Sequence, residues 1–235
     1  MLAIQVPLLD ANIFVPPLHV GLSAPPEACL AAAMAEARFA LLSSYRGSTA
    51  AVNELPLHGW WIVRHERCIG HGSTAFNRAV RALHDLEFFE HDWLTARRAD
   101  DMLVIAARQF GFVWLTNANR VLHRDHASIT FGTTQRHVLA GEERIGVRHD
   151  SATGAVEFEI RSLSRPRHVF AWLAYPIVVA QQRRFASAAT VLMRAKCAEA
   201  ERVAELQRSR RNLKKGGGSL HLFLPFGQER QLKAW

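Results

Sequence analysis

The stretch that most constrains the fold is residues 164–197, a long run of helix-forming sequence that comes directly after a strand-like segment. Pro176 removes a helical hydrogen bond, so we expect a kink or interruption near Trp172. An amphipathic helix of this length predicts a sheet against its apolar face, with any functional site between the two. The predicted face carries one polar member, a glutamine, and consists of Phe170, Leu173, Ile177, Gln181, Phe185, Ala188 and Leu192.

Short strand-like segments fill the middle of the chain. In residues 155–161, apolar side chains alternate with charged ones, which is typical of an antiparallel sheet with one packed and one solvated face. The turns between segments are short, and no long crossover is present, so a doubly wound parallel sheet is disfavoured. A strand at 60–69 and a helix at 73–86 come first, followed by strands at 102–107, 111–115, 119–123, 128–133, 143–148 and 155–161.

The ends of the chain predict additions to one central domain. Residues 1–42 form an N-terminal extension with a helix, residues 43–197 form the main domain, and residues 198–235 form a basic helix, a glycine-rich hinge and an apolar tail. The 235 residues, 49% of them hydrophobic, suffice for one substantial core. Because the sequence shows neither a membrane-spanning run nor a secretory signal, and its three cysteines are scattered, we expect a cytoplasmic protein.

The formal net charge of +8 leaves two interpretations open. The excess is either a basic solvated surface or a means of contacting phosphate on a nucleic acid or an anionic membrane. The aromatic-interleaved basic motifs of RNA-binding modules are absent, so we expect no nucleic-acid partner. The pair His123 and His126 lacks the arrangement of a metal site, and no catalytic signature is recognised, so we expect neither metal nor cofactor.

Several motifs occur in an order that resembles a known family. They are Tyr45-Arg46-Gly47-Ser48-Thr49 with Leu55-Pro56 and Gly59-Trp60, then Ile69-Gly70-His71-Gly72 with Phe76 and Ala79, then Phe131-Gly132-Thr133, His137 and Gly141-Glu142-Glu143-Arg144, and finally Ser164-Arg165-Pro166 with Pro176, Gln182 and Phe185. In this order they resemble the family of domain of unknown function 1990 (UPF0548), over about residues 45–193. The chain departs from the family pattern at Ile129-Thr130 and at Thr134.

That family is similar to the START and Bet v 1-like (SRPBCC) superfamily. The resemblance implies an α+β helix-grip fold, in which a curved antiparallel sheet wraps around the long C-terminal helix. It implies no established activity. Likeness to the superfamily implies only an apolar cavity between sheet and helix that holds a lipid-like or polycyclic ligand.

Binding of a hydrophobic small molecule or lipid-like ligand is therefore the favoured function. We expect Tyr45 and Gln181 to anchor polar groups, while Arg165 either pairs with a carboxylate such as Glu142 or Glu143 or binds an anion. The expected lining of the cavity is Trp61, Phe112, Trp114, Phe131, Phe158, Phe170, Leu173 and Ile177.

Two other functions stay open. In the first, a cyclase or hydratase-type enzyme uses His137 and Glu143 as acid and base, if a turn at residues 140–141 lets them meet. The alternative is that Glu142 and Glu143 lie on opposite faces of a strand, one solvated and one paired with a core arginine. In the second function, the basic helix and apolar tail contact a partner or an anionic membrane, and the protein is a scaffold.

Overall fold

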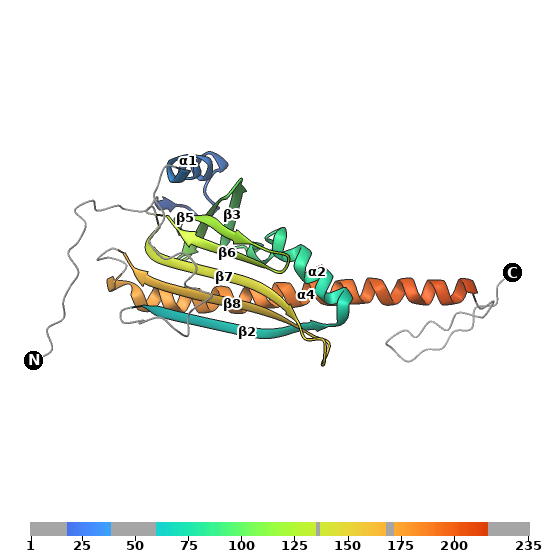
Figure 1. Ribbon diagram of the computed structural model, residues 1–235. Helices are drawn as coiled ribbons and strands as arrows, with labels where there is room; N and C mark the ends of the chain where they lie inside the picture. The colour runs from blue at the N-terminus through green and yellow to red at the C-terminus, as the bar shows by residue number, and fades with distance from the viewer. Residues whose placement is uncertain (1–17, 39–59, 135–136, 168–171, 216–235) are drawn as a thin grey trace, which may run out of the picture.

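The computed structural model describes residues 18–38, 60–134, 137–167 and 172–215. Its strands form one curved antiparallel sheet in the order β2-β8-β7-β6-β5-β4-β3, with β1 paired to the beginning of β5 (Figure 1). The strands are β1 (Leu18–Val20), β2 (Trp61–His71), β3 (Leu94–Ala99), β4 (Met102–Gln109), β5 (Val113–Arg124), β6 (Ser128–Thr133), β7 (Leu139–His149) and β8 (Ala155–Pro166).

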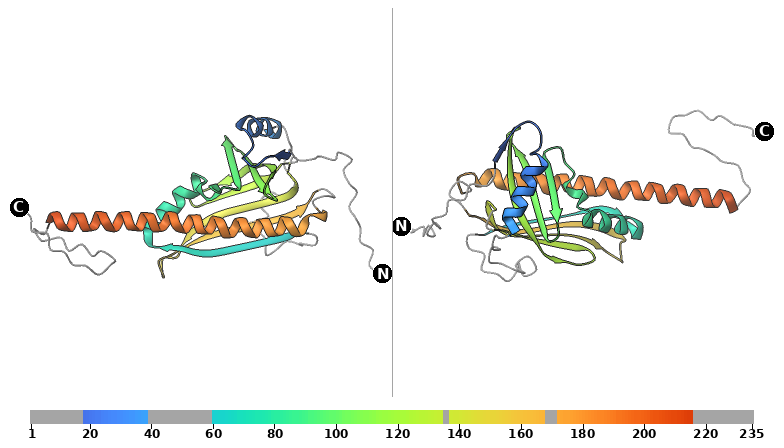
Figure 2. Two further views of the ribbon diagram at one scale, coloured as in Figure 1. Left: turned by 180° about the vertical axis from the view of Figure 1, so that it is seen from behind. Right: turned by 90° about the horizontal axis from the view of Figure 1, so that it is seen from above.

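The helices divide between the two faces of the sheet. The longest, α4 (Tyr175–Lys215), runs along the inner face and projects well beyond the sheet at its C-terminal end (Figures 1 and 2). Helix α2 (Gly72–His84) and the 3-10 turn η1 (Glu87–Phe89) also pack on that face, whereas α1 (Glu27–Arg38) covers β4 and β5 from outside. This arrangement confirms the predicted α+β fold of a curved antiparallel sheet against a long C-terminal helix.

The core fills most of the space between the sheet and the inner helices. Phe158 of β8 is fully buried and lies 6.2 Å, ring centre to ring centre, from Phe88 of η1. Met193 and Cys197 of α4 are also fully buried in the same apolar cluster. Lys196 adds ion pairs to Glu87 (2.7 Å) and Glu90 (3.0 Å) at the rim, which hold α4 against η1.

Two glycines allow the close approach of β2, α2 and α4. A side chain at Gly70 would meet the Cβ atoms of Ala75 at 3.0 Å and Cys197 at 3.2 Å. Gly72 has a φ of 79° and donates its N–H to the carbonyl of Gly154 at 2.7 Å, which starts α2 at the end of the strand. The glycines in this motif therefore serve packing and a tight turn.

The predicted element boundaries need several corrections. The segments at 111–115 and 119–123 are one strand, β5, bent by a register shift between Val121 and His123, and β3 and β1 were not predicted. Strand β8 continues through Pro166, so Arg165 lies near the end of a strand and does not head the helix. Helix α4 begins at Tyr175, so Pro176 lies in the first turn, where a helix needs no backbone N–H donor. The interruption predicted near Trp172 is therefore confirmed.

Beyond Cys197 the helix continues without a break to Lys215, as the basic C-terminal segment predicts. The predicted glycine-rich hinge and apolar tail lie outside the described residues. None of the helices in the described part of the chain is both long and apolar enough to cross a membrane.

Candidate functional site

A small pocket of about 100 Å³ lies between the first turns of α4 and the inner face of the sheet. Strands β4 to β8, η1 and α4 all contribute to its wall. Its polar lining is Asn119, Thr133, His137, Glu142, Glu143, Ser162, Ser164 and Gln182, and its apolar lining is Phe89, Ile105, Phe131 and Leu139. We call it the polar pocket, because hydroxyl, amide and carboxyl groups outnumber apolar side chains in its wall.

Strand pairing explains how the polar groups converge. Glu143 of β7 lies opposite Ser162 of β8 and, on the other side, opposite Phe131 of β6. Ser164 follows two residues after Ser162, and side chains two apart on a strand point to the same face. The same face carries Phe158 and Ile160 further back along β8, both in the core beside α2 and α4. The inner face therefore changes from apolar to polar within one strand.

Glu143 is the most unusual group in the pocket. Burial raises the pKa of its carboxyl to about 7, compared with an ordinary value of 4.5. Among the residues that the structure describes, no cation or hydrogen-bond donor contacts this carboxyl. A buried carboxyl without a partner exchanges its proton near neutral pH, which is the property needed of a general acid or base.

His137 lines the same pocket, but it is in a different state. The backbone N–H of Leu139 donates to Nδ1 of His137 at 2.9 Å, so the ring carries its proton on Nε2. Burial, with a smaller contribution from the charge of Arg167, lowers the pKa of this imidazole to about 3, although the hydrogen bond with Leu139 opposes the shift. His137 is thus a neutral hydrogen-bond donor at physiological pH, and its Nδ1 is not free to accept a proton.

Helix α4 supplies an amide to the pocket. Nε2 of Gln182 donates to the hydroxyl of Ser164 at 3.3 Å, and its Oε1 is buried and accepts no hydrogen bond among the described residues. We predicted Gln181 for this role, but Gln182 is the one that lines the pocket. Oε1 of Gln181 is also buried and accepts no hydrogen bond in the described part of the chain. The buried amide oxygen of Gln182 can accept from a ligand hydroxyl or amide.

The helix face that meets the sheet is rotated by about one residue, roughly 100°, from the predicted face. The buried positions of α4 are Val179, Ala186, Ala189, Thr190, Met193 and Cys197. Leu173 and Ile177 are 77% and 43% exposed, so their prediction as cavity lining is wrong. The cause is the break before Tyr175, because a periodicity that runs unbroken through residues 170–177 assumes one continuous helix there.

Three predicted aromatic lining residues lie elsewhere. Trp114 is buried on the outer face of the sheet, beside Leu30 and Met34 of α1, and its indole N–H donates to the carbonyl of Gly21 at 3.1 Å. Phe112 is 50% exposed in the turn between β4 and β5. Phe158 faces the helices, but it is packed in the solid core and does not line the polar pocket. Trp114 was assigned to the wrong face of its strand, and Phe158 was expected beside a cavity that η1 fills.

The other predicted residues divide between the pocket and its surroundings. Phe131 lines the polar pocket. Trp61 is 37% exposed and its ring packs edge-on against Tyr175 at 5.9 Å. The guanidinium of Arg165 lies 4.8 Å from the ring centre of Trp60, and no carboxylate among the described residues pairs with it. Tyr45 and Phe170 lie outside the described residues.

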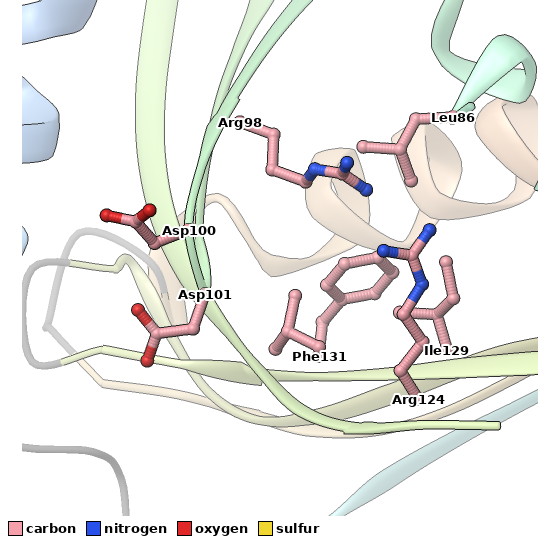
Figure 3. A pocket seen from close by; sticks show the side chains of 8 residues that line it. Leu86, Arg98, Asp100, Asp101, Arg124, Ile129 and Phe131 are labelled. Atoms are coloured by element: carbon pink, nitrogen blue, oxygen red, sulfur yellow. The ribbon is translucent and has the colours of Figure 1, made fainter. Parts of the chain in front are cut away.

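A second pocket, of about 210 Å³, shares Phe131 with the polar pocket (Figure 3). Its wall combines apolar side chains from β5, β6 and the turn between α2 and η1 with charged groups, namely Leu86, Val121, Ile129, Phe131, Arg98, Arg124, Asp100 and Asp101. We call it the arginine pocket. No group of three histidine, cysteine, aspartate or glutamate side chains in the described ranges is placed to hold a metal ion.

Sequence reasoning assigned no site role to Ser162, Ser164 or the two pocket arginines, and it chose Gln181 where Gln182 lines the pocket. The two serines were detectable, because they continue the apolar face of residues 156, 158 and 160 at the same two-residue spacing. Arg98 was not detectable, because the strand that carries it was not predicted.

Comparisons with known proteins agree with the family resemblance. The family of domain of unknown function 1990 (DUF1990) matches residues 44–191. A UPF0548 protein of Deinococcus radiodurans is 32% identical over 141 residues, which cover 52% of this chain and 70% of that protein. A UPF0548 protein of Arabidopsis thaliana is 28% identical over 142 residues, which cover 54% of this chain and 68% of that protein.

Solved structures give more distant matches. The di-domain ARO/CYC StfQ from the steffimycin biosynthetic pathway matches with a TM-score of 0.45 and 10% identity, over 60% of this chain and 51% of that one. Ara h 8.0201 matches with a TM-score of 0.41 and 8% identity, over 57% of this chain and 98% of that one.

Proposed function

We propose, from the premise that this chain belongs to the DUF1990 family, that it binds a small organic molecule in the polar pocket between the sheet and α4. The observation that carries the proposal is the combination of two groups in one pocket: the Glu143 carboxyl, which has no partner among the described residues, and the amide oxygen of Gln182, which is buried without one. Leaving a buried polar group unpaired costs about 1–3 kcal/mol, and a ligand that hydrogen-bonds with it recovers part of that cost.

The wall of the pocket indicates the chemistry of the ligand. Phe89, Ile105 and Phe131 offer apolar contact on one side, while Glu143 and Gln182 offer hydrogen bonds on the other. Below pH 7 the protonated Glu143 carboxyl donates a hydrogen bond, and Oε1 of Gln182 accepts one. A ligand with an apolar body and a carbonyl or hydroxyl group at one end fits this wall. Because the pocket holds only about 100 Å³, it accommodates one end of such a molecule.

Native mass spectrometry of freshly purified protein tests the proposal. We expect a bound small molecule in the wild-type protein and its loss in Ser162→Leu, which places a larger side chain inside the pocket. Ser187→Leu is the matched control, because Ser187 is exposed on α4 and the same substitution there leaves the pocket unchanged. A bound mass that persists in Ser162→Leu, or its absence from all three proteins, would contradict the proposal.

A second candidate function is proton transfer to or from the bound molecule by Glu143. The observation that favours it is the pKa of about 7 for a carboxyl inside a pocket, since an acid or base works best with a pKa near the working pH. His137 then donates a hydrogen bond through Nε2 and does not act as the base. In this case Glu143→Gln retains the bound molecule but abolishes its conversion, whereas a pure binding protein shows no conversion in either form.

A further inference from the structure

The two arginines of the arginine pocket come from separate strands and meet at one helix end. Nη1 of Arg98 in β3 donates to the carbonyl of His84 at 3.2 Å, and Nη2 of Arg124 in β5 donates to the same carbonyl at 2.9 Å. His84 is the last residue of α2, where backbone carbonyls lack helical partners, so the two guanidinium groups satisfy this end of the helix. They are consequently held close together, and Figure 3 shows both reaching into the same space.

A histidine fixes the position of Arg124. Nε of Arg124 donates to Nδ1 of His84 at 2.8 Å, while Nε2 of His84 lies 3.0 Å from the carbonyl of His126. The neutral ring with its proton on Nε2 satisfies both contacts together. The guanidinium is thus oriented before any ligand arrives, which lowers the entropy cost of binding.

Within the described ranges, no carboxylate contacts either of the two guanidinium groups. Neither Arg98 nor Arg124 forms an ion pair with a described residue. Burial and the neighbouring charge of Arg98 lower the pKa of Arg124, and the charge of Asp85 opposes this shift. Asp101 is paired with Arg120 at 3.1 Å, and Figure 3 shows the carboxylates of Asp100 and Asp101 directed away from the guanidinium groups. An anion placed between the arginines relieves their mutual repulsion and uses their remaining N–H donors.

The rest of the arginine pocket is apolar. Val121 of β5 contributes to its wall. Ile129 and Phe131 of β6 lie on the sheet side, and Leu86, between α2 and η1, lies opposite them (Figure 3). Leu86 has a φ of 60°, a backbone conformation that leucine rarely adopts, and this conformation joins α2 to η1 and holds the leucine side chain at the pocket. An anionic group at the arginines therefore has an apolar pocket wall beside it.

The geometry points to an amphipathic organic anion as the ligand, with its charged group held by Arg98 and Arg124 and its apolar chain directed toward Phe131 and the polar pocket. This inference rests on the proposed function, since it treats the two pockets as the ends of one elongated site. Phe131 lines both pockets, so its ring forms part of the wall between them. The exposed arginines face solvent at one end, and Glu143 receives the far end of the chain.

Isothermal titration calorimetry with four defined probes tests the inference: acetate, octanoate, dodecanoate and octanol. We expect octanoate to bind at least about tenfold more tightly than acetate, which lacks the chain, and than octanol, which lacks the charge. The double variant Arg98→Gln/Arg124→Gln should weaken octanoate binding about tenfold or more. The matched control is Arg208→Gln/Arg210→Gln, which removes the same charge from exposed positions on the projecting end of α4 and should leave binding unchanged.

Phe131→Ala tests the connection between the pockets. It removes the ring from their common wall, so the preference should shift from octanoate toward dodecanoate. Equal binding of acetate and octanoate, equal binding of octanol and octanoate, or equal weakening by the two arginine double variants would each overturn the inference.

The outcome of this experiment is separable from that of the proposed function. If the co-purified molecule disappears in Ser162→Leu but octanoate binding ignores the arginines, the inference is wrong and the proposed function stands. If octanoate depends on the arginines but binds equally well to Ser162→Leu and Phe131→Ala, the elongated site is wrong, because the anion then does not extend beyond Phe131.

Discussion

Two halves of the same interface between the sheet and α4 differ in how they are filled. In one, which we call the filled half, Phe158 and Ile160 of β8 are buried against Leu83, Phe88 and other apolar side chains of the inner core. In the other, the polar pocket, Ser162 and Ser164 occupy the next positions on the same face of the same strand. The pairing of β7 with β8 keeps one register through both halves, so along these two strands the difference is one of side chains.

The comparison separates what stabilises the fold from what the fold presents to a ligand. Burial of apolar side chains stabilises the folded state by about 1.5–3 kcal/mol each. Buried Glu143, which has no partner among the described residues, opposes folding when it is ionised. A chain under selection for stability alone would carry apolar residues at these positions, so the polar half indicates a function other than packing.

The largest expected effect follows from emptying the filled half. Phe158→Ala should lower the free energy of unfolding by about 3–5 kcal/mol, because the change removes a fully buried ring and leaves a cavity among rigid neighbours. Urea denaturation followed by circular dichroism measures this quantity. Ser164→Ala is the comparison in the polar half, where the loss of one hydrogen bond with Gln182 should cost about 1 kcal/mol. Equal costs at the two positions would show that the halves do not differ in packing.

The next effect concerns the pH dependence of stability. A carboxyl whose pKa rises from 4.5 unfolded to about 7 folded favours the native state fully below pH 4.5 and loses this contribution as the pH rises toward 7. The total contribution is about 3 kcal/mol. Glu143→Gln should remove it, so the difference in unfolding free energy between variant and wild type should change by about 1.4 kcal/mol per pH unit over that range.

His137 provides the counterpart with the opposite sign. Its pKa falls from 6.5 unfolded to about 3 folded, so its contribution is present above pH 6.5 and is lost as the pH falls toward 3. Between pH 4.5 and 6.5 the two slopes oppose each other in the wild-type protein. His137→Gln should therefore expose the falling slope of Glu143, and Glu143→Gln the rising slope of His137. Parallel pH profiles of wild type and both variants would show that neither group is buried as described.

The sequence predicted the fold more completely than the site. Alternation in residues 155–161 placed Val156, Phe158 and Ile160 on the inner face, and the segment 128–133 coincides with β6. These predictions succeed because period-two burial leaves a local pattern in the sequence. The antiparallel sheet and the long C-terminal helix were confirmed as well, and they were predicted from the order of the motifs that carry the family resemblance.

The site depends on properties that do not appear in a local pattern. Because α4 is rotated by about one residue from the predicted orientation, Gln182 lines the pocket in place of Gln181. The rotation depends on the residue at which the helix begins, and Pro176 indicates that residue only to within one turn. Trp114 faces α1 because β5 is one long strand. Its side chains alternate between the two faces of the sheet without a break through residues 116–118, where a turn was expected. The arginine pocket requires β3, a short strand with two arginines and little alternation. Side-chain direction in these places is set by tertiary packing.

The smallest expected effect compares one change of volume in each half. Ser162→Val adds methyl groups to the wall of the polar pocket, so ligand-free, refolded protein should gain about 1 kcal/mol in unfolding free energy. Ile160→Val removes one methylene from the filled half and should lose about 0.5–1.5 kcal/mol, because no neighbour occupies the space. Chemical denaturation of the two variants beside wild type gives both values. The opposite signs are the critical result: if Ser162→Val is also destabilising, the space beside Glu143 is already packed and cannot receive a ligand.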